Sequence, residues 1–247
     1  MSSTRSTDAP SCTSIVARAL DGTGINLVAS CGIDAYDRRA PRGFRSETLM
    51  PRARGLVVVG SAGRELWDAL RHSAEDGVWW ERANPLDDHV ARMLDRVDMA
   101  LARARIGSRR FEPRLDESPS DRLDFRALGE LTGLGSMGPF GLVIHPVHGP
   151  WWALRGAWLL DVPVDEPSTH PAPCSGCRAP CLGPTRPEGI LLATAAVRGR
   201  CVVGQASRYS DEQIAYHYDR EETVALLRSV APPRAPEPED GGRAPSA

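Results

Sequence analysis

The chain has 247 residues, of which 41% are hydrophobic, and this length and composition suit one domain with a substantial core. Its formal net charge of −2 provides no basic excess for a nucleic-acid or membrane surface. The sequence contains no lysine. Schiff-base chemistry on a protein lysine and the usual phosphate-loop lysine are therefore excluded.

The cellular compartment is predicted from the absence of a membrane-span pattern and of a signal-peptide pattern in the sequence. No apolar run approaches the roughly 18 residues of a membrane span, and the N-terminus shows no signal-peptide pattern. We therefore expect a cytoplasmic protein, whose six cysteines are thiols or metal ligands rather than disulfides. The Ser/Thr-rich residues 1–14 and the Pro-rich tail 231–247 are predicted to be disordered, which leaves residues 15–230 as one folded domain.

The first half of the chain contains one clear strand and one clear helix. Residues 55–60, GLVVVG, are typical of a strand buried on both faces. The glycines after it precede a helical pattern at 64–70, where a phosphate site is conceivable, but a structural turn is the better interpretation. Residues 85–105 repeat apolar side chains at three- and four-residue steps, which predicts an amphipathic helix. His89, near its start, is expected to be solvated or capping.

The second half is organised around the stretch GLVIHPVHGPWWALRGAWLLDV. A helix is predicted at 125–134, followed by a glycine-rich turn. Apolar runs at 142–144 and 157–162 then predict two strands that meet at a loop, as in a hairpin. Arg155 lies in an otherwise apolar segment, so it needs either an internal partner or an anionic ligand.

The sequence PCSGCRAPC and a distant Cys201 indicate a group of thiols at Cys174, Cys177, Cys181 and Cys201. The spacing permits zinc or one iron–sulfur cluster. It lacks the second pair of a zinc ribbon and the four-cysteine run of a ferredoxin, so free or redox-active thiols stay open as well. Further on, Ser210 and Gln213 have the spacing of a capping box that opens a helix at 211–230.

Four segments occur in the order and approximate spacing found in the CblC-type cobalamin-processing proteins. They are Gly141-Leu-Val-Ile-His-Pro, Gly149-Pro-Trp-Trp-Ala-Leu-Arg-Gly, Cys181 with Pro-Thr-Arg shortly after, and Arg208-Tyr-Ser-Asp-Glu-Gln-Ile-Ala-Tyr. The chain resembles this family from about residue 15 to 230. The resemblance implies a single α+β, nitroreductase-like domain, with helices packed on a mixed or antiparallel sheet. It implies an enzyme that removes the upper axial ligand of cobalamin, by reductive decyanation or thiol-dependent dealkylation, and passes the product on.

The resemblance also implies which residues form the site. The corrin is expected against residues 125–128, Gly141, Val143 and Leu154, with Trp151 either lining that wall or filling the core; the first range comprises Phe125, Arg126, Ala127 and Leu128. Arg155 and Arg208 are implied as catalytic residues that bind the carboxylates of glutathione or another small thiol. His145 and His148 are expected to form local hydrogen bonds rather than to bind cobalt. FMN as an electron donor, a homodimer and a downstream acceptor protein are further implied.

A second resemblance, to epoxyqueuosine reductase and the reductive dehalogenases, involves Ala127-Leu-Gly-Glu-Leu-Thr-Gly-Leu-Gly, the His145-Pro turn and the cysteine run. It predicts the same cobalamin ligand but a different chemistry. The six cysteines are too few for two four-thiol clusters, which need eight. A cobalamin-dependent reductase with one iron–sulfur cluster and a non-catalytic cobalamin trafficking module therefore remain as alternatives.

Overall fold

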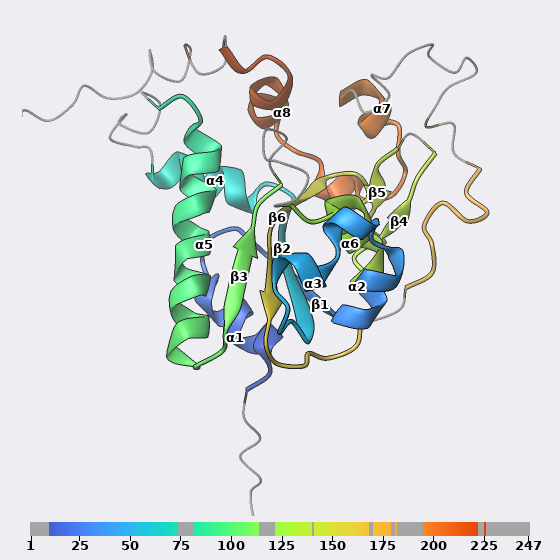
Figure 1. The fold of residues 1–247 in the computed structure, drawn as a ribbon. Coiled ribbons are helices and arrows are strands. Elements are labelled where there is room, and N and C mark those ends of the chain that lie inside the picture. Colours follow the sequence, from blue (N-terminus) through green and yellow to red (C-terminus); the bar gives the residue numbers. More distant parts are fainter. Residues whose placement is uncertain are drawn as a thin grey trace, which may run out of the picture.

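The central element of the fold is strand β2 (Gly55–Ala62), whose eight residues are all buried. It lies inside an antiparallel four-stranded sheet of order β1-β2-β6-β3, with β1 at Leu27–Gly32, β6 at Trp152–Leu160 and β3 at Ser108–Phe111 (Figure 1). The predicted buried strand at 55–60 is confirmed and extends two residues further.

The computed structural model describes residues 10–73, 82–113, 122–139, 141–167, 170–178, 181, 195–221 and 225. The predicted disordered tail 231–247 and residues 1–9 lie outside these ranges. Helix α1 (Cys12–Ala19) begins after the capping side chain of Ser11, so it overlaps the end of the N-terminal segment predicted to be disordered. Within the described ranges, no helix is both long enough and apolar enough to span a bilayer.

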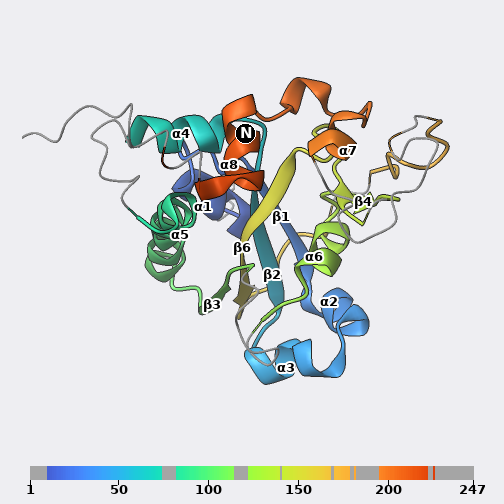
Figure 2. The same ribbon diagram turned by 90° about the horizontal axis from the view of Figure 1, so that it is seen from above.

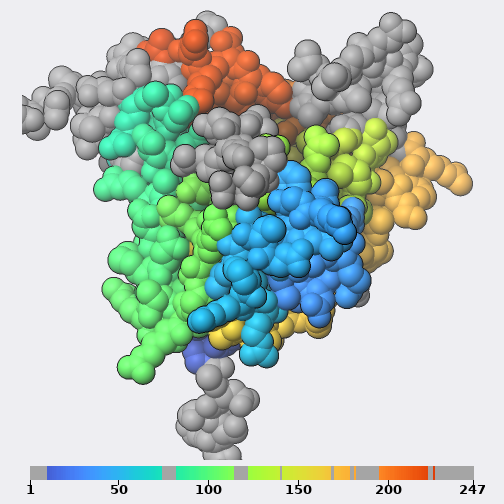
Figure 3. All heavy atoms as spheres, viewed as in Figure 1, coloured from blue at the N-terminus to red at the C-terminus, as the bar shows by residue number. Residues whose placement is uncertain are grey.

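Helices cover both faces of the sheet, which gives the α+β architecture that was predicted. On one face lie α1, α4 (Glu65–Ser73) and α5 (Pro85–Arg103); on the other lie α2 (Ile33–Arg39), α3 (Ser46–Leu49) and α6 (Phe125–Leu131) (Figures 1 and 2). A short 3-10 helix, η1 (Arg42–Phe44), links α2 to α3, and these elements form the near surface in Figure 3.

Strand β2 contributes to two separate cores because its side chains alternate between the faces. Val57 and Val59 pack with α1, α4 and α5, whereas Leu56 and Val58 pack with the elements on the opposite face. Helix α5 closely matches the prediction for residues 85–105. His89, expected to be solvated or capping, is instead only 2% exposed, because it follows Leu86 by three residues and shares the buried face of the helix.

The two strands predicted around the loop at 145–150 do form, but they do not pair with each other. β5 (Val143–Ile144) pairs with β4 (Ser136–Met137) in a separate small sheet, whereas β6 pairs with β2 and β3. The hairpin interpretation is therefore wrong. β6 pairs with β2 along its whole length, and the loop closes on itself through a bridge between His145 and Gly149.

The C-terminal part lies over one end of the sheet and consists of α7 (Ala195–Gly199), the 3-10 helix η4 (Gln205–Ser207) and α8 (Asp211–Tyr218) (Figure 2). The Ser210 side chain accepts a hydrogen bond from the Gln213 backbone N–H, as the capping box predicts. The Gln213 Oε1 atom is buried and accepts no hydrogen bond from any described residue, so the reciprocal bond of the box to the Ser210 N–H does not form.

Candidate functional site

A β-bulge in β6 determines where Arg155 points. Leu154 pairs with Gly60 and Gly156 pairs with Val59, so Arg155 has no residue opposite it in β2. Leu154 packs with the core on the α6 face, while Gly156 lies against Leu94 of α5 on the other face. An extra residue of this kind re-aims its side chain. The Arg155 side chain lies on the Gly156 side, where its Nε donates to Ser61 Oγ at 2.8 Å.

Arg155 has no carboxylate partner among the described residues; the Ser61 hydroxyl is its one hydrogen-bond partner there. Burial lowers the pKa of Arg155, while Tyr209 and Asp87 are close enough to oppose that shift. Arg155 is partly buried, and no carboxylate among the described residues is hydrogen-bonded to it, so the position is suited to an anionic ligand. Of the two interpretations left open by the sequence, the ligand is the one that remains to be tested.

A second arginine, Arg198 of α7, adds to this positive charge. Its Nε is buried, and no hydrogen-bond partner for it lies among the residues that the structure describes. Desolvation and the charges of Arg155 and Arg198 lower the pKa of His217, although the residue is exposed. Burial raises the pKa of Tyr209, whereas Arg155 and Arg198 act in the opposite direction. We call Arg155, Arg198, Tyr209 and His217 the guanidinium site. The sequence analysis missed three of its members, because only folding brings α7 and α8 over β6.

Arg208, the other predicted catalytic residue, lies at the edge of the guanidinium site. Its guanidinium pairs with Asp211 at 2.9 Å and stands 5.9 Å above the centre of the Trp151 ring. The Trp151 ring in turn contacts Tyr209 edge-on, with centroids 5.3 Å apart. Arg208 is therefore close to the same tyrosine as Arg155, but it is more exposed and already has an acidic partner.

An apolar wall occupies the opposite face of β6. Phe125 of α6, Val143 of β5 and Leu154 of β6 are partly exposed and border one buried cluster. Gly129 keeps these elements close, because a Cβ there would lie 3.3 Å from Val143 and 3.4 Å from the Trp152 ring. The structure thus brings together three of the residues predicted to contact a corrin.

The other predicted corrin contacts have different surroundings. Ala127 and Leu128 are buried behind the wall, and Arg126 is exposed. Gly141 has a φ of 79° with no atom within 4 Å of a Cβ position, so the backbone conformation requires glycine there and the space beside it is open. Trp151 is fully buried and contacts Tyr209, which places it with the guanidinium site and in the core.

The loop at 145–150 is held by one histidine ring. His145 Nδ1 accepts hydrogen bonds from the backbone N–H groups of Val147 at 3.0 Å and His148 at 3.2 Å. An acceptor nitrogen carries no proton, so the neutral ring carries its proton on Nε2 and offers no free lone pair to a metal. Burial and the neighbouring rings of His148 and His170 lower the pKa of His145 to about 4. The ring therefore has the local structural role that was predicted.

Two glycines allow this loop to pack closely against the C-terminal segment. A Cβ on Gly149 would lie 2.0 Å from Val203 O, and a Cβ on Gly204 would lie 2.1 Å from the carbonyl of His148. Both residues have positive φ, at 59° and 75°. The Ser207 hydroxyl also meets His148 Nδ1 at 2.7 Å. The close crossing fixes η4 and the start of α8 against the loop.

The four predicted metal ligands lie in one region without forming a closed site. Cys174 and Cys181 pack against Ile144 and Val197. In the part of the chain that the structure describes, no three histidine, cysteine or acidic side chains are placed to hold a metal ion.

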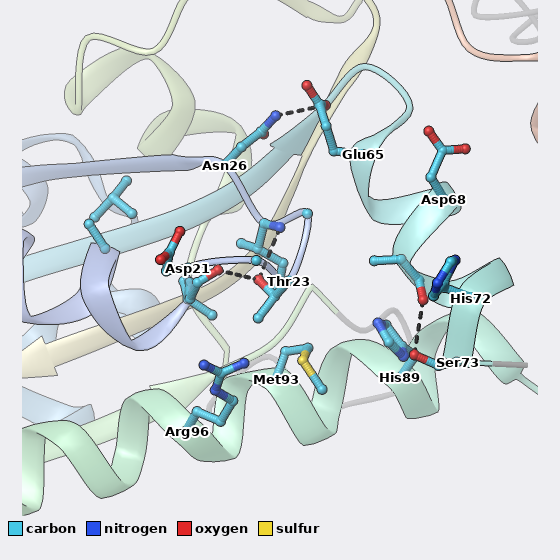
Figure 4. A pocket seen from close by; sticks show the side chains of 17 residues that line it. Asp21, Thr23, Asn26, Glu65, Asp68, His72, Ser73, His89, Met93 and Arg96 are labelled. Carbon is cyan, nitrogen blue, oxygen red and sulfur yellow. Dashed lines mark hydrogen bonds between the residues drawn. The ribbon is translucent and has the colours of Figure 1, made fainter.

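A cavity of about 800 Å³ lies elsewhere, between α4, α5 and the loop after α1 (Figure 4). Asp21, Glu65 and Asp68 stand around it, together with Met93 and Arg96 of α5. None of the residues predicted for the functional site lines it. The cavity lies on the α5 side of the sheet, away from the apolar wall, and we assign it no role.

The architecture falls in the nitroreductase-like α+β class. The particular structure most relevant here is the crystal structure of a C. elegans B12-trafficking protein, CblC, which is a homologue of human MMACHC. The similarity covers 87% of this chain and 95% of that chain, with a TM-score of 0.53 and 15% sequence identity. At this identity the likeness shows a shared fold, which confirms the predicted resemblance at the level of architecture.

Weaker similarity extends to two other proteins. Epoxyqueuosine reductase from Streptococcus thermophilus gives a TM-score of 0.47 at 13% identity, over 78% of this chain and 54% of that chain. The catabolic reductive dehalogenase NpRdhA gives 0.41 at 14% identity, over 64% of this chain and 22% of that chain. No protein-family model matches the sequence, and no curated protein matches it.

Proposed function

We propose that this protein binds a cobalamin as its substrate, removes the upper axial ligand and releases the product to an acceptor. The proposal is supported by one local arrangement in β6. Leu154 belongs to the apolar wall, and the next residue, Arg155, belongs to the guanidinium site. A fold shared with a B12-trafficking protein over most of both chains adds to this support.

The apolar wall fits one face of a corrin. A macrocycle needs a flat apolar surface with few polar contacts, and Phe125, Val143 and Leu154 are partly exposed apolar side chains from three elements. Gly141 has open space beside it, so a large ligand can approach the backbone there. Because His145 has its lone pair occupied by backbone N–H groups, we propose that no protein histidine replaces the nucleotide base on the cobalt.

The guanidinium site fits the carboxylate of a small thiol. Charge-assisted hydrogen bonds to a carboxylate contribute about 1.5 to 3 kcal/mol each, and Arg155 has no carboxylate partner in the described structure. A thiol of tripeptide size spans about 10 Å, and β3 pairs with β6 only from Ala157 to Leu160, so we propose that a thiol anchored at Arg155 reaches the Leu154 side around this edge of β6. Nearby arginines also favour the thiolate form over the thiol.

The proposed dealkylation is a displacement at carbon. The thiolate sulfur attacks the alkyl carbon bound to cobalt, a carbon–sulfur bond forms, and the cobalt–carbon bond breaks with its electron pair left on the metal. The products are a thioether and cob(I)alamin, so no external oxidant or reductant is needed. Reductive decyanation would require an added donor, for which the sequence resemblance implies FMN. Glutathione as the thiol, a homodimer and a downstream acceptor also remain predictions.

Visible spectroscopy tests the proposal directly. Purified protein mixed with methylcobalamin should shift the corrinoid spectrum to the form in which the lower base has left cobalt. Adding glutathione under anaerobic conditions should then produce cob(I)alamin and the methyl thioether, identified by mass spectrometry. A spectral shift without turnover by any thiol or reduced flavin would favour a trafficking module. An unchanged spectrum at every protein concentration would refute cobalamin binding.

A further inference from the structure

Helix α8 and the residue before its N-cap supply two members of the guanidinium site. His217 lies in α8, and Tyr209 directly precedes the N-cap Ser210. The two rings contact each other with centroids 5.7 Å apart, and Tyr209 contacts the Trp151 ring at 5.3 Å. The position of both side chains in the site with Arg155 therefore depends on how α8 is fixed to the rest of the protein.

One carboxylate joins α8 to α4, the helix beside it in Figure 2. Trp67 of α4 is 2% exposed, and its Nε1–H donates to Glu212 Oε2 at 2.8 Å. Arg71, one turn further along α4, has its Nε 3.6 Å from the same oxygen. A buried indole N–H needs an acceptor, and a carboxylate makes a stronger hydrogen bond than a neutral group. Glu212 therefore fixes the first turn of α8 on α4.

The same face of α8 makes a second contact with α4. Tyr216 follows Glu212 by four residues, so the two side chains lie on one face of the helix. The Tyr216 and Trp67 rings have centroids 5.0 Å apart, and the Tyr216 hydroxyl accepts a hydrogen bond from the Leu86 N–H of α5 at 3.4 Å. Tyr216 is 4% exposed and packs in the buried cluster on the α5 face of the sheet. Contacts with α4 and α5 thus set the rotation of α8 about its own axis.

We propose that Glu212 is the positioning residue of the guanidinium site: its hydrogen bond from Trp67 fixes α8, and through α8 the side chains of Tyr209 and His217. The inference rests on the proposed function, because it assumes that this site binds the carboxylate of a thiol. Among the described residues, Glu212 has its hydrogen bond and ion pair with α4 and none with a member of the site. It therefore acts on an anion through the place of α8 and not by direct contact.

Charge and position predict opposite effects for the removal of Glu212. The residue carries a negative charge on the helix that holds His217. If charge alone mattered, its loss would strengthen the binding of another anion, because like charges repel. If Glu212 holds α8 in place, its loss weakens that binding even though a repulsive charge has gone. The sign of the change therefore separates a positioning role from a purely electrostatic one.

The test is the binding of S-methylglutathione, the thioether expected from methylcobalamin and glutathione, to the full chain without corrinoid. Isothermal titration calorimetry measures the dissociation constant. Glu212→Ala should raise it at least about fivefold, because Tyr209 and His217 lose their place. Glu212→Gln should keep it within about twofold of the wild type, since the amide oxygen can accept the same indole N–H.

Turnover of methylcobalamin with glutathione gives a second measurement. In Glu212→Ala the KM for glutathione should rise by the same factor as the dissociation constant, with kcat within about twofold of the wild type. A merely structural role would lower the folded fraction and hence the apparent kcat, and would leave KM unchanged. Far-ultraviolet circular dichroism at the assay temperature measures the folded fraction of each variant.

Two further variants complete the test. Asp211→Ala removes the neighbouring carboxylate, whose side chain is 89% exposed and pairs with Arg208, so S-methylglutathione should bind as tightly as in the wild type or more tightly. Trp67→Phe removes the indole donor and should weaken binding as Glu212→Ala does, and the double variant should be less than about twofold weaker than either single variant.

The proposal is overturned if Glu212→Ala binds S-methylglutathione as tightly as the wild type or more tightly. It is also overturned if the effects of Trp67→Phe and Glu212→Ala multiply in the double variant, or if the wild type does not bind the probe. The calorimetry needs no corrinoid, so a failure of cobalamin binding and a failure of this inference are distinguishable.

Discussion

The two faces of β6 differ in whether their side chains find the packing or polar partners that they need. On the apolar wall, Leu154 continues the packing of a buried cluster and needs no specific partner. On the guanidinium site, Arg155 is partly buried with a single hydroxyl as its hydrogen-bond partner among the described residues, and Asp87 opposes part of the fall in its pKa. The first surface needs only apolar contact, whereas the second presents a cation that has no carboxylate hydrogen-bonded to it among those residues. We propose that the arginine face is the one that binds an anion.

The largest effect should come from disturbing the close crossing between the loop at 145–150 and the C-terminal segment at Gly204. In Gly204→Ala the new methyl group would lie 2.1 Å from the carbonyl of His148, in a backbone conformation that disfavours alanine. We expect a loss of about 3 kcal/mol in the free energy of unfolding, measured with urea.

Gly199→Ala is the matched control for that change. A Cβ at Gly199 meets nothing within 4 Å, so its stability should stay within about 0.5 kcal/mol of the wild type. Equal stabilities for the two variants would show that the crossing of the loop and the C-terminal segment is not tight in solution.

The next prediction separates the apolar wall from the arginine face. Leu154→Asp puts a carboxylate on the wall, and we expect cobalamin binding to weaken at least about thirtyfold through lost apolar contact and a desolvated charge. Titration of the visible spectrum measures the dissociation constant. Val202→Asp, at a side chain 62% exposed on another turn, should change it less than about twofold. A weak effect at Leu154 would place the corrin elsewhere.

A smaller effect, confined to thiol turnover, should come from the arginines. Arg155→Gln removes a partly buried cation without a carboxylate partner among the described residues, and we expect kcat/KM for the thiol to fall about 10- to 100-fold. Arg208→Gln should cost about threefold, because that side chain is exposed and already paired with Asp211. Corrin affinity should change little in both variants. The reverse ranking would assign the thiol carboxylate to Arg208.

The last prediction concerns the pH dependence of stability that comes from His145 in the loop at 145–150. The pKa of His145 is about 4 in the folded chain, below the ordinary value of 6.5, so the unfolded chain binds more protons between these values. Stability from this residue is complete above pH 6.5 and is lost as the pH falls toward 4, by about 2 kcal/mol at pH 5 and about 3 kcal/mol at most.

His145→Asn tests this directly. The asparagine carbonyl can accept the same backbone N–H bonds but does not titrate. Urea unfolding at pH 7 and pH 5 should therefore show a smaller loss of stability in the variant than in the wild type. Identical losses would mean that His145 is not buried as a neutral ring.

The elements that sequence predicts well are those whose pattern is local. Residues 55–60 form a continuous apolar run and residues 85–105 carry the period of a helix, and both elements form close to the predicted bounds. Partner choice is not local, which is why β5 and β6 were wrongly joined in one hairpin. His89 shows that a local signal can also be missed, since its three-residue spacing from Leu86 already placed it on the buried face.

The candidate site was predictable only in part. Arg155 stands out because a cation interrupts an apolar run, and Phe125, Val143 and Leu154 follow from the family resemblance. Arg198 and His217 carry no sequence signal, because their role comes from α7 and α8 folding over β6. The bulge depends on the register between β2 and β6, which no spacing within β6 reveals.

Arg155 is the residue of β6 that has no partner in β2. Its deletion would leave the pairing of Leu154 with Gly60 and of Gly156 with Val59 unchanged. Excising position 155 would let Leu154 and Gly156 follow each other as ordinary neighbours in the sheet. Deleting this one position would therefore remove the Arg155 guanidinium and leave the strand pairs intact, which separates the proposed anion site from the architecture of the sheet.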